Sequence, residues 1–129
     1  MQTFEVHKVV SQEDLDELKH VNNVRYIEWV NDIAEAHWIS KSSEQERSDF
    51  FWVLVHHSID YKGEAKLGDV LRLKTYVESS KGVKSVRVVE VFNETTDRLI
   101  TKSETTWCFM DSSTKRPTRI PEAIAQMFS

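Results

Sequence analysis

The sequence predicts an α+β domain in which a five-stranded antiparallel sheet wraps around one central helix. Three observations lead to this fold class. A segment from Asn22 to about Ser40 has apolar residues at spacings of three and four, which is the period of a helix. One earlier segment and four later ones are rich in β-forming residues, and two of the later ones alternate with a period of two. The resulting order of one strand, one long helix and four strands is typical of a sheet packed on a helix.

The first strand and the helix come from the N-terminal third of the chain. Residues 3–10 are rich in β-forming side chains and predict a strand, and the polar, acidic residues 11–19 predict a loop or a short turn. Asn22 or Asn23 is placed to cap the first helical turn. Apolar and aromatic residues lie on more than one side of the helix, so we expect other parts of the chain to cover it broadly.

The rest of the chain predicts four strands and a short terminal helix. A polar loop is expected at residues 42–49, and Pro121 opens the terminal helix. Polar turns at residues 80–82 and 93–97 join consecutive strands, which favours antiparallel pairing. The expected strands are Phe50–Tyr61, Asp69–Val77, Val83–Phe92 and Leu99–Met110. In the first two, the residues expected to share a face are Phe51, Val53, Val55, Ile59 and Tyr61, and Leu71, Leu73, Thr75 and Val77.

Size and charge exclude several kinds of protein. A chain of 129 residues is long enough for one hydrophobic core, so residues 1–129 are expected to form a single domain. The net charge is −4 and the two signs are interleaved, so we expect no nucleic acid as a partner. No apolar run approaches the roughly 20 residues of a membrane-spanning helix. The first ten residues lack the features of a signal peptide, and a cytoplasmic location is therefore expected.

The cysteine and the histidines give no metal site, and no cofactor is expected. The single cysteine, Cys108, excludes an internal disulfide and lies in an apolar run, where a small buried residue is expected. His56 and His57 are neighbours on a strand, so their side chains should point to opposite faces and cannot bind one metal ion together. His37 lies in the helix without a partner at a metal-binding spacing, and we expect it to be structural.

Polar residues that can do chemistry gather just before the helix. Asp16, His20, Asn22 and Asn23 lie within eight positions of one another. The N-terminus of a helix presents free N–H groups and a partial positive charge, so it can polarise a carbonyl oxygen. A carboxylate beside it could attack the carbonyl carbon or take a proton from water. The residues alone also allow a plainer interpretation, in which Asp16 is a loop acid, His20 packs and the asparagines cap the helix.

A resemblance favours the chemical interpretation. The run of Asp16, His20-Val21-Asn22-Asn23-Val24, Tyr26-Ile27 and Trp29 resembles the motif of plant and bacterial acyl-ACP thioesterases, and more loosely the 4-hydroxybenzoyl-CoA thioesterase group. These proteins have the hotdog fold, which has the element order expected here. The resemblance implies that Asp16 is the nucleophile or general base, and that the backbone N–H of Asn23 forms the oxyanion hole.

The resemblance continues after the second expected strand. The segment Asp60-Tyr61-Lys62-Gly63-Glu64-Ala65 is similar to a strand-end motif of the acyl-ACP enzymes, in which the glutamate is a catalytic candidate. Glu64 is its match, and with His20 it would position water. Two positions depart from the family pattern. Leu18 replaces an asparagine and Ala65 replaces a cysteine, so a Cys-His mechanism is excluded and the carboxylate of Asp16 is expected to do most of the work.

The resemblance implies a thioester hydrolase of fatty acid metabolism, with an acyl-CoA or an acyl carrier protein thioester as substrate. It also implies a homodimer or homotetramer, since the plant enzymes have two hotdogs in one chain and this chain has one. The small basic cluster of Lys115, Arg116 and Arg119 is either a solvated surface or a contact for CoA phosphates or for an acidic carrier protein.

Three further points stay open at this stage. A non-catalytic hotdog protein that binds an acyl ligand is the main alternative to an enzyme, and a hotdog dehydratase or hydratase is a weaker one, because its motifs are absent. The tryptophans and phenylalanines could line an acyl tunnel, but most are expected in the core. Acyl chain length and the choice of carrier are not predicted.

Overall fold

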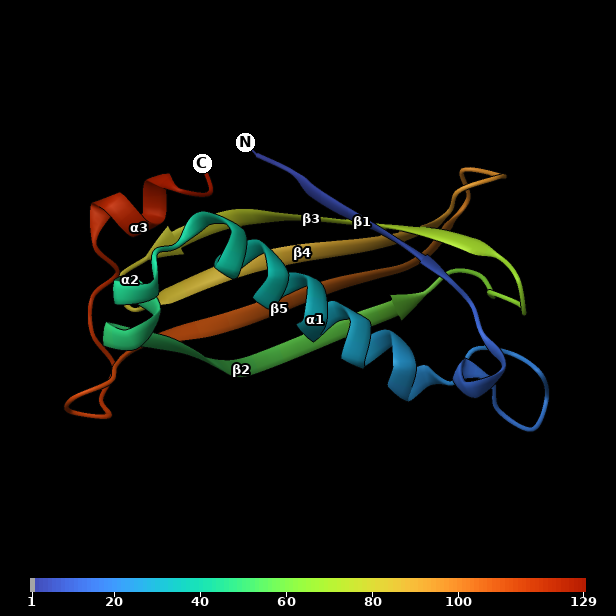
Figure 1. Ribbon diagram of the computed structural model, residues 1–129, viewed down its shortest axis with the longest axis horizontal. Helices are drawn as coiled ribbons and strands as arrows, with labels where there is room; N and C mark the ends of the chain where they lie inside the picture. Colours follow the sequence, from blue (N-terminus) through green and yellow to red (C-terminus); the bar gives the residue numbers. More distant parts are fainter. Residues whose placement is uncertain (1) are drawn as a thin grey trace.

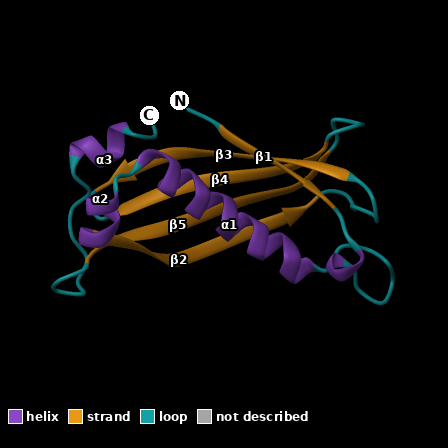
Figure 2. Ribbon diagram, in the orientation of Figure 1, coloured by secondary structure: helices purple, strands orange, loops and turns teal. Residues whose placement is uncertain are grey.

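A computed structural model of the protein describes residues 2–129. Its five strands form one antiparallel sheet in the order β1-β3-β4-β5-β2, so that β1 and β2 are the two edges. The helix α1 crosses one face of this sheet, and the short helices α2 and α3 lie together at one end (Figures 1 and 2). The elements are β1 Phe4–Val9, a 3-10 turn Gln12–Asp14, α1 Asn23–Lys41, α2 Glu44–Asp49, β2 Phe50–Tyr61, β3 Val70–Lys81, β4 Lys84–Asn93, β5 Leu99–Asp111 and α3 Glu122–Gln126.

The packing of α1 on the sheet explains the breadth of its apolar surface. Val30 and Ile33 of the helix are almost completely buried against the middle strands of the sheet. Leu71, Leu73 and Thr75 of β3 point to the same side and are buried as predicted. The predicted α+β arrangement of a five-stranded antiparallel sheet around one helix is therefore confirmed. The buried cluster contains Val10, Val21, Tyr26, Trp29, Val30, Ile33, Ala65, Leu71, Leu73, Val89, Val91 and Ile100.

The predicted helix cap is also confirmed. Asn22 is the N-cap residue, and its side-chain oxygen accepts a hydrogen bond from the backbone N–H of Val24 at 3.0 Å. This bond satisfies one of the N–H groups that have no partner at the start of a helix. Asn23 is consequently the first residue of α1, and the polar segment that starts at Asp16 ends where the helix begins.

Two expectations about local structure are wrong. Residues 42–49 do not form only a loop, because Glu44–Asp49 is the helix α2, which starts with a capping box between Ser43 and Glu46. Strand β3 continues to Lys81 instead of ending at Val77, and Gly82, with a φ of +65°, forms the hairpin turn to β4.

The predicted buried face of β2 is wrong in part. Val53 and Val55 are 39% and 50% exposed, whereas Trp52 and Leu54 on the opposite side are half-buried. A β-bulge between Leu54 and His56 then shifts the alternation, so that Ile59 again faces the core. The alternation of apolar and polar residues cannot reveal a bulge, because the residues on each side of the bulge still alternate with a period of two.

Cys108 is buried and free, so the expectation of a small buried residue at this position is confirmed. None of the helices in residues 2–129 is long and apolar enough to cross a membrane.

Candidate active site

The segment from Asp16 to His20 forms a tight loop ahead of α1. The backbone N–H of Asp16 donates to the carbonyl of His20 at 2.8 Å, and Oδ1 of Asp16 accepts from the N–H groups of Leu18 at 2.9 Å and His20 at 3.2 Å. Lys19 takes a φ of +63° to close the loop. The side chain of Asp16 is exposed, and its Oδ2 has no hydrogen-bond partner among residues 2–129. One carboxylate oxygen therefore orders the loop while the other is free.

Bonds to the rest of the fold hold this loop in place. The N–H of Asn22 donates to the carbonyl of Asp14 at 2.9 Å, and the buried Val21 donates to the carbonyl of Ala65 at 3.3 Å. The carboxylate of Asp14 is itself buried and accepts from the backbone N–H of Ser11 at 2.9 Å. Backbone contacts on both sides thus fix the position of Asp16 relative to the start of α1.

The structure brings His20 and Glu64 together. Nε2 of His20 lies 3.4 Å from Oε2 of Glu64, although the two residues are far apart in the sequence. Glu64 lies in the loop between β2 and β3, and both side chains are accessible, with 40% and 59% of their surfaces exposed. Asp16 contacts the backbone of His20 and not its imidazole, because its N–H donates to the His20 carbonyl and its Oδ1 accepts from the His20 N–H. Within residues 2–129 no side-chain contact links Asp16 to the pair of His20 and Glu64.

Asn23 offers a free backbone N–H. As the first residue of α1 it precedes the first helical hydrogen bond, and the hydrogen bonds of residues 2–129 give its N–H no acceptor. Its side chain is exposed and makes no cap, since Asn22 has that role. The segment therefore carries a free carboxylate oxygen at Asp16 and ends at a helix start that offers a hydrogen-bond donor and the positive end of the helix dipole.

The two departures from the family pattern have physical explanations. Ala65 is completely buried beneath the loop, where it packs with Tyr26, so this position has no access to a substrate. Burial of Tyr26 raises the pKa of its phenol to about 12, helped by the nearby Glu64, so Tyr26 stays neutral. Leu18 is 75% exposed and points away from the core.

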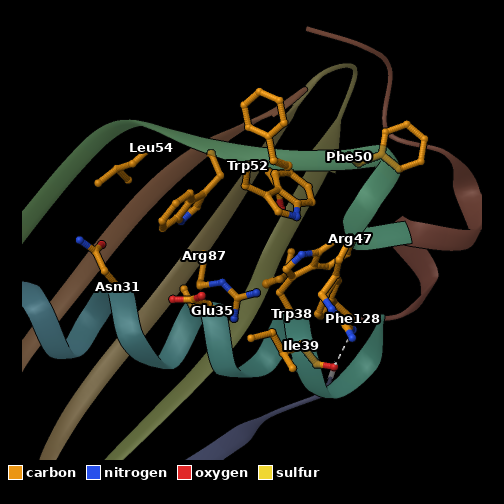
Figure 3. Close-up of a pocket in the computed structure, with 15 residues that line it drawn as sticks. Asn31, Glu35, Trp38, Ile39, Arg47, Phe50, Trp52, Leu54, Arg87 and Phe128 are labelled. Carbon is orange, nitrogen blue, oxygen red and sulfur yellow. Dashed lines mark hydrogen bonds between the residues drawn. The ribbon is translucent and has the colours of Figure 1, made fainter. Parts of the chain in front are cut away.

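A cavity of about 490 Å³ lies between the second half of α1, the start of β2 and the middle of the sheet (Figure 3). Three tryptophans line it, Trp38, Trp52 and Trp107, together with Phe50 and other apolar side chains. Some aromatic residues therefore line a cavity, while others such as Trp29 and Phe109 belong to the core, as the sequence suggested. The cavity begins about 12 Å along α1 from Asn23, at Asn31, given the rise of an α-helix.

The sequence did not reveal the polar residues of this cavity. Asn31, Glu35 and Arg87 line it, and Arg87 is only 6% exposed. Arg87 lies in β4 between two valines, and an arginine flanked by apolar residues is usually expected on the solvent side of a strand. No sequence signal therefore distinguished it from a surface residue.

Arg87 is bound to His37 inside the protein. Its Nη1 lies 2.9 Å from Nδ1 of His37 and 3.1 Å from Oγ1 of Thr75. Because a guanidinium can only donate, Nδ1 of His37 accepts and the imidazole is neutral. Burial, and then the nearby positive charge of Arg87, lower the pKa of His37 to about 4. The complete burial of His37 fits the structural role that the sequence suggested.

This burial predicts a loss of stability in acid. Because the pKa of His37 is lower in the folded protein than the usual value of 6.5, the unfolded chain binds more protons between pH 6.5 and 4. The free energy of unfolding should fall by about 3 kcal/mol across that window as the pH decreases. Urea unfolding at pH 7.5 and 4.5 should show this fall in the wild type and a smaller one in His37→Gln. The exposed His56→Gln is the matched control, and an equal fall in all three proteins would contradict the assignment.

The other titratable groups give no metal centre. His56 is exposed and His57 is half-buried on the opposite side of β2, and burial lowers the pKa of His57. Within residues 2–129, no group of three histidine, cysteine, aspartate or glutamate side chains is placed to hold a metal ion.

Comparison with known families identifies the class of protein. A model of the thioesterase-like superfamily matches residues 10–128, so the chain belongs to this superfamily. Comparison with curated protein sequences found no match.

Comparison with solved structures confirms the hotdog fold. A 1,4-dihydroxy-2-naphthoyl-CoA thioesterase from Synechocystis is 20% identical, with a TM-score of 0.84 over 98% of this chain and 95% of its own. A Staphylococcus aureus protein in complex with CoA is 19% identical, with a TM-score of 0.89 over 98% and 81%. The 12:0-ACP thioesterase from Umbellularia californica is 15% identical, with a TM-score of 0.85 over 98% of this chain and 51% of its own.

Proposed function

We propose that the protein hydrolyses acyl thioesters, linked either to CoA or to an acyl carrier protein. The observation that supports this most directly is the free Oδ2 of Asp16 in a loop that leads straight into the free N–H of Asn23. Membership of the thioesterase-like superfamily supports the same reaction class. In the reaction, an oxygen from water ends on the acyl carbon, the carbon–sulfur bond breaks, and the thiol sulfur takes a proton.

Two routes give these products from the same residues. Oδ2 of Asp16 can add to the carbonyl carbon and form an anhydride, which water then hydrolyses, or it can take a proton from water that attacks directly. In both routes the N–H of Asn23 stabilises the negative charge on the carbonyl oxygen. A single turnover in heavy-oxygen water separates them, because only the anhydride route can leave the label in the Asp16 carboxylate.

The thiol release assay tests the proposal. Purified protein is mixed with a panel of acyl-CoAs and acyl carrier protein thioesters, and the free thiol is measured with a chromogenic trap. We expect release from at least one substrate well above the rate without protein. Binding of the acyl compounds without release from any of them would overturn the proposal and favour the non-catalytic alternative.

Glu64 is proposed to position the attacking water through His20. The 3.4 Å contact between the two side chains is the basis for this role. Glu64→Gln should lower kcat about 10-fold and leave KM nearly unchanged, since a positioned proton acceptor is lost while binding is kept. Steady-state kinetics measures both constants. Glu17→Gln, an exposed acid of the loop ahead of α1, is the matched control, and an equal loss in both variants would contradict the role of Glu64.

We also propose a homodimer that pairs two β2 strands. β2 is an edge of the sheet and runs opposite to α1 (Figure 1). A two-fold axis at this edge, perpendicular to the sheet, would keep both helices on one face and reverse their directions. The start of one α1 would then lie beside the second half of the other, so that the cavity of one protomer would serve the reactive loop of its partner. Two such dimers could stack into a tetramer.

Light scattering tests this arrangement. Val55 lies in β2 and is half exposed, and Val55→Lys should shift the protein from dimer to monomer, because a lysine on an edge strand opposes pairing. Val9→Lys, at a valine of the other edge strand that is also exposed, should leave the dimer intact. A monomeric wild type would contradict the proposal.

The basic cluster keeps its two interpretations. Lys115, Arg116 and Arg119 are exposed on the segment between β5 and α3. As a proposal, they contact the phosphates of CoA or an acidic carrier protein. Replacing all three with glutamine should then raise KM for one carrier more than for the other.

A further inference from the structure

Arg87 is a buried cation without a carboxylate partner. The salt bridges within residues 2–129 include no contact to Arg87, and its neighbours at hydrogen-bond distance are the neutral His37 and the hydroxyl of Thr75. Both of these contacts use Nη1, and the ring of Phe128 lies 5.5 Å from the centre of the guanidinium. The N–H groups of Nε and Nη2 are therefore left without a protein acceptor in the described part of the chain.

A buried charge is costly unless an opposite charge compensates it. Burial lowers the pKa of Arg87 to about 10, which still leaves the guanidinium protonated at neutral pH. An unpaired buried cation of this kind is rare in a stable core. Because Nε and one terminal nitrogen of a guanidinium form a fork that matches a carboxylate, the free side of Arg87 has the geometry for an anion.

This free side belongs to the cavity. Arg87 lines it together with Trp38, Trp52 and Phe128, and Figure 3 shows the guanidinium among these rings. The cavity has one other cation, Arg47, but its Nη1 is already bound to the backbone carbonyls of Ser42 and Ile39. Among residues 2–129, Glu35 is the only carboxylate that lines the cavity, and it is exposed and forms no ion pair with Arg87 within 4.0 Å.

We propose that this cavity binds a ligand with an apolar body and a terminal carboxylate, which pairs with Nε and Nη2 of Arg87. The tryptophan rings bind the body and exclude water, which strengthens the ion pair. A volume of about 490 Å³ is in the range of small-molecule sites. A neutral acyl chain would leave the buried charge uncompensated, so the cavity selects for the anion.

The carboxylate of the bound ligand can come from two sources, and both of them follow from the proposed function. It is the far end of an acyl group that is attached to its carrier at the other end, or it is the acid that hydrolysis releases. Both have the same chemistry at Arg87. The binding site itself does not depend on hydrolysis, so its test can be separated from the test of activity.

Binding is measured by tryptophan fluorescence, because three tryptophans line the cavity. The probes are decanoic acid and decanol, which share an apolar body and differ in charge. We expect wild-type protein to bind decanoate about 10- to 100-fold more tightly than decanol, since a charge-assisted pair replaces an uncompensated charge. Equal binding of the two probes, or no binding of either, would overturn the proposal.

Variants assign the selectivity to Arg87. Arg87→Gln should bind both probes about equally, because its affinity for decanoate falls while its affinity for decanol stays the same. Arg72→Gln removes the same charge outside the cavity and should keep the selectivity. If Arg47→Gln loses the selectivity and Arg87→Gln keeps it, the assignment is wrong.

Circular dichroism checks that the variants fold, and if Arg87→Gln does not fold, the exposed Glu35→Gln replaces it. Removing that negative charge should tighten decanoate binding several-fold and leave decanol unchanged, and unchanged decanoate binding overturns the proposal.

Kinetics then separates the two sources. If the anion is the far end of the substrate, wild type should release thiol from the CoA thioester of decanedioic acid at least 10-fold faster than from decanoyl-CoA, and Arg87→Gln should lose this preference. If it is the product, the two thioesters should react alike and decanoate should inhibit only while Arg87 is present. Selective binding of decanoate by a protein that hydrolyses no thioester would overturn the proposed function and leave the site standing.

Discussion

Asp16→Asn lowers the rate of thiol release by about 1,000-fold, if the proposed reaction is correct. The replaced group is then the nucleophile or the base, and the loss of a positioned proton acceptor or nucleophile typically costs a factor of 10² to 10⁴. The variant keeps an oxygen that can accept the hydrogen bonds from Leu18 and His20, so the loop should stay ordered. The melting temperature should therefore change little while kcat falls.

The control for this experiment lies one residue away. Glu17→Gln removes a charge from the same exposed loop and has no assigned role, so its rate should stay close to wild type. Thiol release from a reactive acyl-CoA, measured beside thermal unfolding for all three proteins, separates chemistry from folding. Unchanged release in Asp16→Asn would remove Asp16 from the mechanism without touching the reaction class.

Phe109→Ala produces the largest loss of stability that we expect. Phe109 is completely buried in β5 and its ring lies 4.7 Å from those of both Phe50 and Trp52. Deleting a buried phenylalanine removes its transfer free energy and leaves a void, which together cost about 4 kcal/mol. Because Phe50 and Trp52 line the cavity, the variant should also weaken decanoate binding.

Phe92→Ala is the matched substitution on the neighbouring strand. Phe92 of β4 is half-buried, and Arg72 lies over its ring at 4.7 Å. Its loss should cost about 1 kcal/mol, because most of the ring is not in the core. Urea unfolding gives both free energies. A cost for Phe109→Ala no larger than that for Phe92→Ala would show that the core relaxes around the missing ring.

The fold was predictable because its signals are local and repeated. The spacing of apolar residues and the asparagines at its start predicted the helix α1. The shared face of Leu71, Leu73 and Thr75 followed from the alternation of residues along a strand. The bulge in β2 and the helix α2 were missed for opposite reasons. The residues on each side of a bulge still alternate, so the sequence pattern does not show where the bulge lies. The helix α2 is short and polar, so its sequence resembles that of a loop.

The candidate site was predictable only as a set of residues. The resemblance pointed to Asp16, His20, Asn23 and Glu64, but the 3.4 Å contact between His20 and Glu64 depends on how two distant loops meet. Arg87 could not be found in this way. Its burial results from contacts with His37 of α1 and with Phe128 near the end of the chain, which no single segment of the sequence encodes.

The loop and the cavity are built from different kinds of contact. Backbone hydrogen bonds from Asn22 to Asp14 and from Val21 to Ala65 hold the loop, whereas side chains shape the cavity. A substitution at Trp38, Trp52 or Arg87 would therefore alter the cavity and leave the hydrogen bonds of the loop in place. If the loop carries the proposed reaction and the cavity binds the ligand, specificity could diverge in descendants of this sequence by exchanges that do not touch the reacting groups.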